Sequence, residues 1–159
     1  MNYIVLNDLQ VSKYVDEITK KIQDSNYKPD IIISLGRGGM IPTRLLSDSL
    51  SVKEIAFLPA SMYIGVKTRN IKPKMGTLTA SVFRKNILLV DDILDTGITI
   101  DAAIEILKRS GASDIKTATL LCKKNANRKP TYFYMNCTEN DWIIFPWEKK
   151  EFEKELKNA

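Results

Sequence analysis

Short apolar runs alternate with amphipathic segments along this chain, and the pattern predicts an α/β fold. The apolar runs predict buried strands at 30–35, 52–58, 86–90 and 114–122, with shorter ones at 132–135 and 142–145. Helical spacing of apolar residues predicts helices over 7–25, 42–50, 98–110 and from 147 onward. Strands that alternate with helices favour a mainly parallel, twisted sheet flanked by helices.

The segment 60–81 departs from this alternation. It contains Gly65, Pro73, Gly76 and four basic residues, and its end at 77–82 shows a weak alternation that favours a hairpin. Connections of this length are usually functional or mobile. We therefore predict a single domain over 1–159 with a flexible loop or hairpin arm at about 60–81.

Composition narrows the class of protein. Of the 159 residues, 44% are hydrophobic and 27% charged, as in globular domains, and no apolar run approaches the roughly 20 residues that span a bilayer. The N-terminus has neither a basic start nor a long apolar stretch, so we expect no signal peptide. The two cysteines lack metal-ligand spacing, and we expect reduced thiols in a cytoplasmic protein without a membrane partner.

The formal net charge is +5, and the chain contains no histidine. The lysines are spread along the chain rather than grouped with aromatic residues, so anionic small substrates explain the charge as well as nucleic acid does. Without histidine, acid–base chemistry must use Asp, Glu, Lys, Tyr or water, and a histidine-based triad is excluded.

The strongest chemical signal follows the apolar run 86–90. Two carboxylates, Asp91 and Asp92, come first, and the small polar loop 95–99 then leads into an amphipathic helix. Unpaired N–H groups in such a loop and at a helix N-terminus suit a phosphate. The carboxylates suit sugar hydroxyls or Mg²⁺, which prefers oxygen ligands. The stretch therefore predicts a site for a phosphorylated sugar.

Two further polar signals follow predicted strands. The loop 36–39, Gly-Arg-Gly-Gly, comes directly after one strand; its glycines permit close approach to a ligand, and the Arg37 guanidinium matches phosphate oxygens. Lys123 follows the strand at 114–122. Because ligands of parallel α/β sheets bind outside the carboxyl ends of the strands, we expect these residues and 91–99 on one rim.

Residues 86–99 resemble the phosphoribosyl-pyrophosphate (PRPP) signature of type I phosphoribosyltransferases: an apolar strand, two acids, two apolar residues and a loop of the form x-Thr-Gly-x-Thr. The resemblance extends over about 28–148 and is nearest to purine phosphoribosyltransferases of the short xanthine-guanine type. It implies the type I phosphoribosyltransferase fold, with a small C-terminal hood at about 124–148, and a homodimer or homotetramer.

The resemblance implies a role for each part of the rim. Asp91 and Asp92 would bind the ribose hydroxyls and Mg²⁺, the latter either directly or through water or those hydroxyls. The 5′-phosphate would lie in the loop formed by Thr96, Gly97, Ile98 and Thr99. Pyrophosphate would lie on the loop formed by Gly36, Arg37, Gly38 and Gly39, where the family often has a cis peptide before the basic residue. Tyr63 would belong to a mobile loop that shields the reaction from water.

Asp95 and Lys123 would select the base. Asp95 stands where the resembling hypoxanthine-guanine and xanthine-guanine enzymes carry Asp, and it could accept a proton from purine N7 as N9 attacks. A role as helix N-cap is the alternative for this residue. Lys123, or its neighbour Lys124, would contact the purine 6-oxygen.

The segment 141–148 would cover the purine. Trp142 would stack on the base, with the Ile143 backbone at the 2-position edge, unless the Trp142 ring belongs to the core instead. For Trp147 we expect a core position.

The predicted function is Mg²⁺-dependent transfer of the phosphoribosyl group from PRPP to guanine, hypoxanthine or xanthine. The products are the nucleoside 5′-monophosphate and pyrophosphate, as in purine salvage. Two alternatives stay open: a regulator of the same fold that binds PRPP or nucleotides, and a phosphoribosyltransferase for another base such as adenine. A regulator would not need Asp95, Lys123 and Trp142 together, and we expect no nucleic-acid partner.

Overall fold

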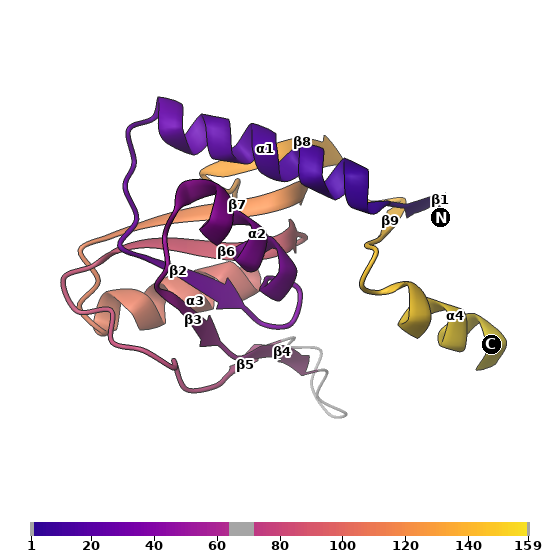
Figure 1. Ribbon diagram of the computed structural model, residues 1–159. Coiled ribbons are helices and arrows are strands. Elements are labelled where there is room, and N and C mark those ends of the chain that lie inside the picture. Colours follow the sequence, from indigo (N-terminus) through magenta and orange to yellow (C-terminus); the bar gives the residue numbers. More distant parts are fainter. Residues whose placement is uncertain (1, 64–71, 159) are drawn as a thin grey trace.

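A five-stranded parallel sheet forms the centre of the computed structural model, which describes residues 2–63 and 72–158 (Figure 1). Its strands are β2 (Ile31–Leu35), β3 (Ile55–Leu58), β6 (Asn86–Leu94), β7 (Asp114–Lys123) and β8 (Tyr132–Cys137). They lie in the order β3-β2-β6-β7-β8, and each neighbouring pair is parallel. The predicted α/β fold with a mainly parallel sheet is therefore confirmed.

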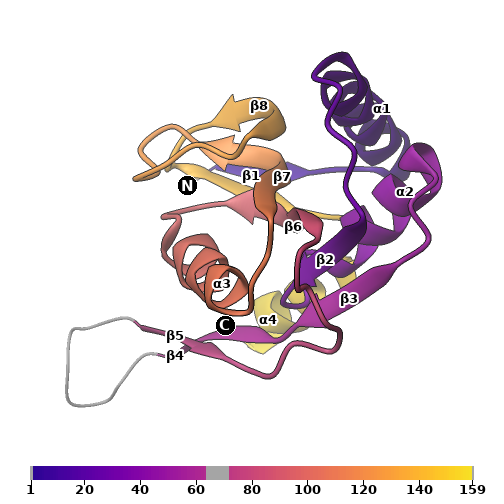
Figure 2. The ribbon, with the colours of Figure 1, turned by 90° about the vertical axis from the view of Figure 1, so that its left-hand side faces the viewer.

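Helices cover both faces of the sheet (Figure 2). The helices are α1 (Asp8–Asp24) and α2 (Met40–Leu50) on one face and α3 (Ile98–Arg109) on the other. Ile32 packs in the core beneath α1 and α2, whereas its neighbours Ile31 and Ile33 pack in the core beneath α3. Because successive side chains of a strand point to opposite faces, a strand buried on both sides carries a continuous apolar run.

Local signals set the helix ends where the sequence predicts them. The side chains of Asn7 and Gln10 each accept the other's backbone N–H at 2.9 Å, which forms a capping box at the start of α1. Pro42 lies in the first turn of α2, where the missing N–H costs no helical hydrogen bond. Gly111, with φ of +83°, follows α3 in the left-handed conformation that glycine adopts without strain. Among the described residues, no helix is long and apolar enough to cross a membrane.

The hairpin arm lies within the predicted segment 60–81, but the alternating residues 77–82 are not part of it. Its strands are β4 (Ala60–Tyr63) and β5 (Lys72–Met75), paired antiparallel, and 64–71 lie outside the described residues. The alternation at 77–82 is not a strand. Thr79 instead exchanges two hydrogen bonds with Phe57 at the edge of β3, and Val82 is buried in the core beneath α3. The segment alternates because one side faces the sheet, not because it forms a hairpin.

A second, two-stranded parallel sheet joins the N-terminus to the C-terminal part of the chain. It pairs β1 (Asn2–Val5), a strand that the sequence did not predict, with β9 (Asp141–Ile144). After β9, the Trp147 ring stacks on Phe145 with ring centroids 4.9 Å apart and packs against the core, as predicted. The helix α4 (Lys149–Asn158) then projects from the body beside the rim of the main sheet (Figure 1).

Candidate active site

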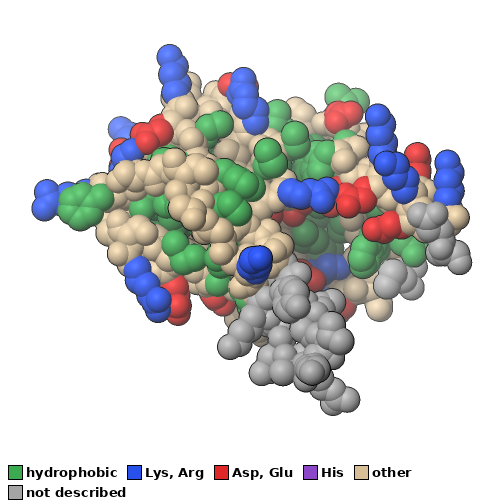
Figure 3. Space-filling model, turned by 90° about the horizontal axis from the view of Figure 1, so that it is seen from below, with side chains coloured by type: hydrophobic (Ala, Val, Ile, Leu, Met, Phe, Trp, Pro, Cys, Tyr) green, Lys and Arg blue, Asp and Glu red, His purple; other side chains and the backbone are tan. Residues whose placement is uncertain are grey.

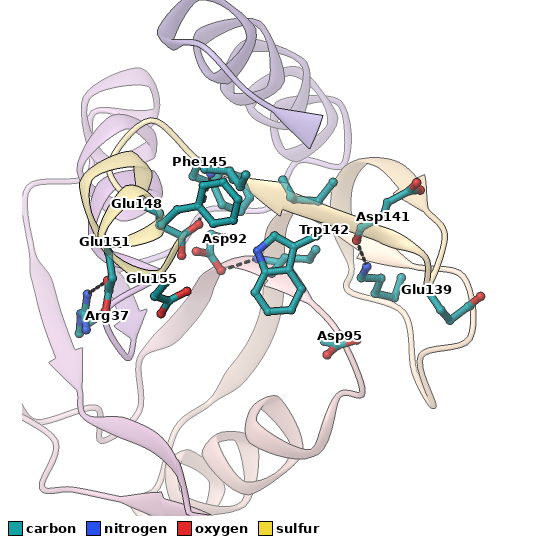
Figure 4. Close-up of a pocket in the computed structure, with 15 residues that line it drawn as sticks. Arg37, Asp92, Asp95, Glu139, Asp141, Trp142, Phe145, Glu148, Glu151 and Glu155 are labelled. Atoms are coloured by element: carbon teal, nitrogen blue, oxygen red, sulfur yellow. Dashed lines mark hydrogen bonds and ion pairs between the residues drawn. The ribbon is translucent and has the colours of Figure 1, made fainter. Parts of the chain in front are cut away.

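A cavity of about 560 Å³ opens at the carboxyl ends of β6 and β7, beneath β9 and α4 (Figure 4). In the space-filling view, acidic and basic side chains gather around a hollow on this side of the molecule (Figure 3). Predicted site residues from four segments line the cavity: Arg37, Asp92, Asp95, Lys123, Trp142 and Ile143. The rim predicted from the strand ends therefore brings together residues up to about a hundred positions apart in the sequence.

A smaller adjoining hollow of about 300 Å³ lies between the glycine loop and the acid pair. It is lined by the predicted residues Gly36, Arg37, Gly38, Asp91, Asp92 and Thr99, and also by Ser61 and Glu148. Arg37 and Asp92 border both spaces. Thr96, Gly97 and Ile98 line neither of them, and the side chain of Tyr63 lies outside the described part of the structure.

The acid pair interrupts the regular alternation of β6. Leu88 and Leu94 are six positions apart, so a regular strand would place them on the same face. Instead, Leu88 packs beneath α1 and α2, and Leu94 packs beneath α3. Asp92 has no register partner on β7. Its N–H donates to the Asp91 carboxylate at 2.9 Å, and the N–H of Ile93 donates to the Asp92 carboxylate at 2.7 Å. The two carboxylates thus accept hydrogen bonds from backbone amides at the point where the register with β7 is interrupted.

Burial makes both carboxylates hard to ionise. Burial raises the pKa of Asp92 to about 6, with a further contribution from the nearby carboxylate of Glu148. The pKa of Asp91 is raised well above its ordinary value, by burial first and by the charge of Asp92 second. A ligand that brings positive charge or hydroxyl donors would stabilise the ionised forms of Asp91 and Asp92.

The glycine loop packs directly on this acid pair. A Cβ atom at Gly38 would lie 2.6 Å from both carboxylate oxygens of Asp92, and one at Gly39 would lie 2.3 Å from the carbonyl oxygen of Val90. The predicted cis peptide before Arg37 is wrong, since every described peptide bond is trans. Gly36 makes the turn instead, with φ of +55°, a conformation that glycine adopts without strain.

Gly97, rather than Asp95, is the N-cap of α3, so the capping alternative for Asp95 is wrong. Gly97 has φ of +96° and no side-chain cap bond, and the next N–H, that of Ile98, donates to the Thr96 hydroxyl at 3.4 Å. Asp95 itself is exposed at the cavity wall. Arg128, which no sequence motif marks, packs over Gly97.

Lys123 lies at the wall of the cavity opposite Arg37 and bonds to the backbone there. Its ammonium donates to the backbone carbonyls of Thr138, at 2.9 Å, and of Asp141. Lys124 does not line the cavity; its backbone N–H bonds to Cys137. Trp142 is 49% exposed and its ring lies over the cavity opposite Asp95, so it is not a core residue (Figure 4).

Three carboxylates near the C-terminus line the cavity although the sequence did not predict them as site residues. Glu148, Glu151 and Glu155 line the cavity and recur at spacings of three and four, which puts them on one face of a helix. Glu148 is half-buried, and its pKa is raised mainly by that burial. The spacing was visible in the sequence, but nothing local shows that this face turns towards the sheet.

Comparison with known proteins agrees with this geometry. A family model described as the phosphoribosyl transferase domain matches residues 4–151. A xanthine-guanine phosphoribosyltransferase of Idiomarina loihiensis is 28% identical over 117 residues, covering 74% of this chain and 70% of the relative. A hypoxanthine phosphoribosyltransferase of Buchnera aphidicola is 33% identical over 119 residues, covering 73% and 66%. The structure of a purine phosphoribosyltransferase from Pyrococcus horikoshii superposes with a TM-score of 0.80 at 31% identity, covering 92% and 94% of the two chains.

Proposed function

This chain belongs to the phosphoribosyl transferase domain family of enzymes, and from that premise we propose that it transfers the phosphoribosyl group of PRPP to a 6-oxopurine. Guanine, hypoxanthine or xanthine would be the acceptor, and pyrophosphate would leave. The main support for the proposal is that two kinds of surface adjoin at one rim. The acid pair and the glycine loop form a surface suited to a sugar phosphate, and Trp142 covers a neighbouring space suited to a flat base.

The sugar-phosphate half suits PRPP. Among the described residues, no cationic side chain pairs with Asp91 or Asp92, and ribose hydroxyls can donate to these carboxylates. The first-turn N–H groups of α3 can receive the 5′-phosphate. Arg37, at the edge of both spaces, can bind pyrophosphate oxygens through its planar fork.

Asp91 and Asp92 also fit Mg²⁺. Within the described residues, no group of three His, Cys, Asp or Glu side chains forms a complete metal cage. Mg²⁺ is usually held by one or two carboxylates together with waters and substrate phosphates, so an incomplete cage is the expected arrangement. When bound there, Mg²⁺ would neutralise charge on the departing pyrophosphate.

The flat half suits a purine with an oxygen at position 6. A lysine ammonium has three protons, and two of those on Lys123 are already donated to backbone carbonyls. The third is left for an acceptor such as a 6-oxygen. The 6-amino group of adenine offers protons instead, which would leave the ammonium without an acceptor, so we expect adenine to be a poor substrate.

The reaction breaks the bond from C1′ to pyrophosphate and forms the bond from C1′ to N9. As N9 attacks, the purine N7 loses its proton, and the Asp95 carboxylate at the cavity wall can accept it. Trp142 would hold the base in plane while Asp91 and Asp92 orient the ribose. Positioning and electrostatics thus supply most of the catalysis.

A panel of bases tests the proposal. Protein, PRPP and Mg²⁺ are mixed with guanine, hypoxanthine, xanthine or adenine, and nucleotide is measured by chromatography. We expect product with at least one 6-oxopurine and little with adenine; no product from any 6-oxopurine would refute the proposal. Asp95→Asn should lower kcat much more than PRPP affinity, whereas the exposed Asp16→Asn on α1 should behave as wild type.

Assembly and location complete the proposal. We propose a homodimer or homotetramer in a cytoplasm, and light scattering on the purified full chain measures the mass. A monomer that turns over at the full rate would refute the assembly prediction.

A further inference from the structure

The C-terminal helix α4 reaches the site that PRPP is proposed to occupy. Glu151 and Phe152 of α4 line the cavity together with Asp92 and Arg37, and Glu148 borders both this cavity and the adjoining hollow. Figure 4 shows the side chains of Glu151, on α4, and of Glu148, just before it, turned towards the cavity. A substrate with several phosphates would therefore meet carboxylates on this wall.

Arg37 forms an ion pair with α4 at this wall. Its guanidinium donates to the Glu151 carboxylate at 2.7 Å, across 114 positions of sequence. Among the described residues, Arg37 and Lys123 are the basic ones that line the cavity, and Lys123 lies at its other end, bonded to backbone carbonyls. One nitrogen of the guanidinium proposed to bind pyrophosphate is therefore already paired with a protein carboxylate.

The hold of α4 on the rim is weak. The side chains of Arg37 and Glu151 are 81% and 57% exposed, and such exposed pairs stabilise little. Helix α4 makes sparse contacts with the other described elements; the ring centroid of Phe152 lies 5.2 Å from that of Tyr3. A ligand with stronger charge can thus displace the helix without disturbing the main sheet.

We propose that Glu151 takes the place of a pyrophosphate oxygen at Arg37 in the free protein, so that α4 competes with PRPP for the site. This inference rests on the proposed function. Before PRPP binds, the ion pair must open and α4 must move aside, which lowers the apparent affinity for PRPP. Glu151 is then a determinant of substrate affinity, although it takes no part in the chemistry.

A matched pair of variants tests the competition. Glu151→Gln removes the charge that holds Arg37, and Glu153→Gln removes the same charge from an exposed position of α4 that does not line the cavity. We expect Glu151→Gln to lower the KM for PRPP about two- to fivefold, the scale of an exposed ion pair, without changing the KM for the base. The effect should shrink as salt is added, because exposed charges are screened.

Three results would overturn the inference: an unchanged KM for PRPP in Glu151→Gln, a raised KM, or an equal fall in Glu153→Gln. Calorimetric titration of inorganic pyrophosphate into the full chain measures the same competition without turnover, and Glu151→Gln should bind it more tightly than wild type. If no base gives product, the proposed function fails, while this titration still decides whether Glu151 competes for Arg37.

Discussion

Replacing Asp92 by asparagine should make the free protein more stable while it damages the site. The carboxylate is buried at the carboxyl end of β6, faces Glu148, and has its pKa raised to about 6 from an ordinary value of 3.8. A difference of about two pKa units, at 1.36 kcal/mol each, corresponds to about 3 kcal/mol of instability when the group is ionised. Asparagine keeps the shape and still accepts the N–H of Ile93, but it carries no charge.

The sign of the pH dependence follows from proton binding. Between about pH 4 and pH 6 the folded protein keeps a proton on Asp92 that the unfolded chain has lost, so the stability of wild type falls as the pH rises through this window. Above about pH 6 the penalty is complete. The gain from Asp92→Asn should therefore be close to zero at pH 4 and reach up to about 3 kcal/mol at pH 7.5.

Urea unfolding followed by circular dichroism at several pH values measures this gain, with the exposed Asp16→Asn as control. Activity should fall about 10- to 100-fold, the scale of a lost hydrogen bond to a charged group. A variant that is less stable than wild type at pH 7.5 would refute the reasoning. So would a gain in stability that does not change between pH 4 and pH 7.5, because the gain is attributed to ionisation.

Three further substitutions probe other parts of the rim. Trp142→Ala should raise the KM for the base by about 5- to 150-fold through lost stacking and leave the KM for PRPP nearly unchanged, as steady-state kinetics will measure. Gly38→Ala places a Cβ 2.6 Å from the Asp92 carboxylate, so scanning fluorimetry should show a Tm lower by several degrees; an unchanged Tm would contradict the close packing. Lys123→Met should reduce kcat/KM for guanine by at least about tenfold, and equal activity would exclude a contact with the 6-oxygen.

The sequence predicted the parts of the fold that depend on local pattern. The continuous apolar runs of β2 and β6 reflect burial on both faces of a sheet, and the Asn7–Gln10 capping box and Gly111 set helix ends through contacts within a few residues. Because parallel strands align their carboxyl ends, the same pattern also predicted that Arg37 and Lys123 would face one cavity.

Features that depend on distant partners could not be predicted. β1 is a strand because β9, about 140 positions away, pairs with it. The alternation at 77–82 resembles a hairpin strand, but its periodicity comes from Val82 in the core and Thr79 at the edge of β3. All four residues of β1 are exposed, so no buried face marks it as a strand, whereas the pattern at 77–82 shows a buried side and leaves open what covers it.

The charge around the cavity decides how a polyanion can enter it. Carboxylates of β6, β9 and α4 line its wall. Of the basic residues that line it in the described part of the chain, Arg37 is held by Glu151 and Lys123 by backbone carbonyls. PRPP without cations would meet repulsion from these carboxylates. A substrate that carries Mg²⁺ reverses the balance, since the ionisation that Asp91 and Asp92 resist in the free protein becomes favourable beside a cation. The acid pair is therefore costly to the free protein and useful only with metal and substrate bound, which is why the stability gain and the activity loss of Asp92→Asn have one cause.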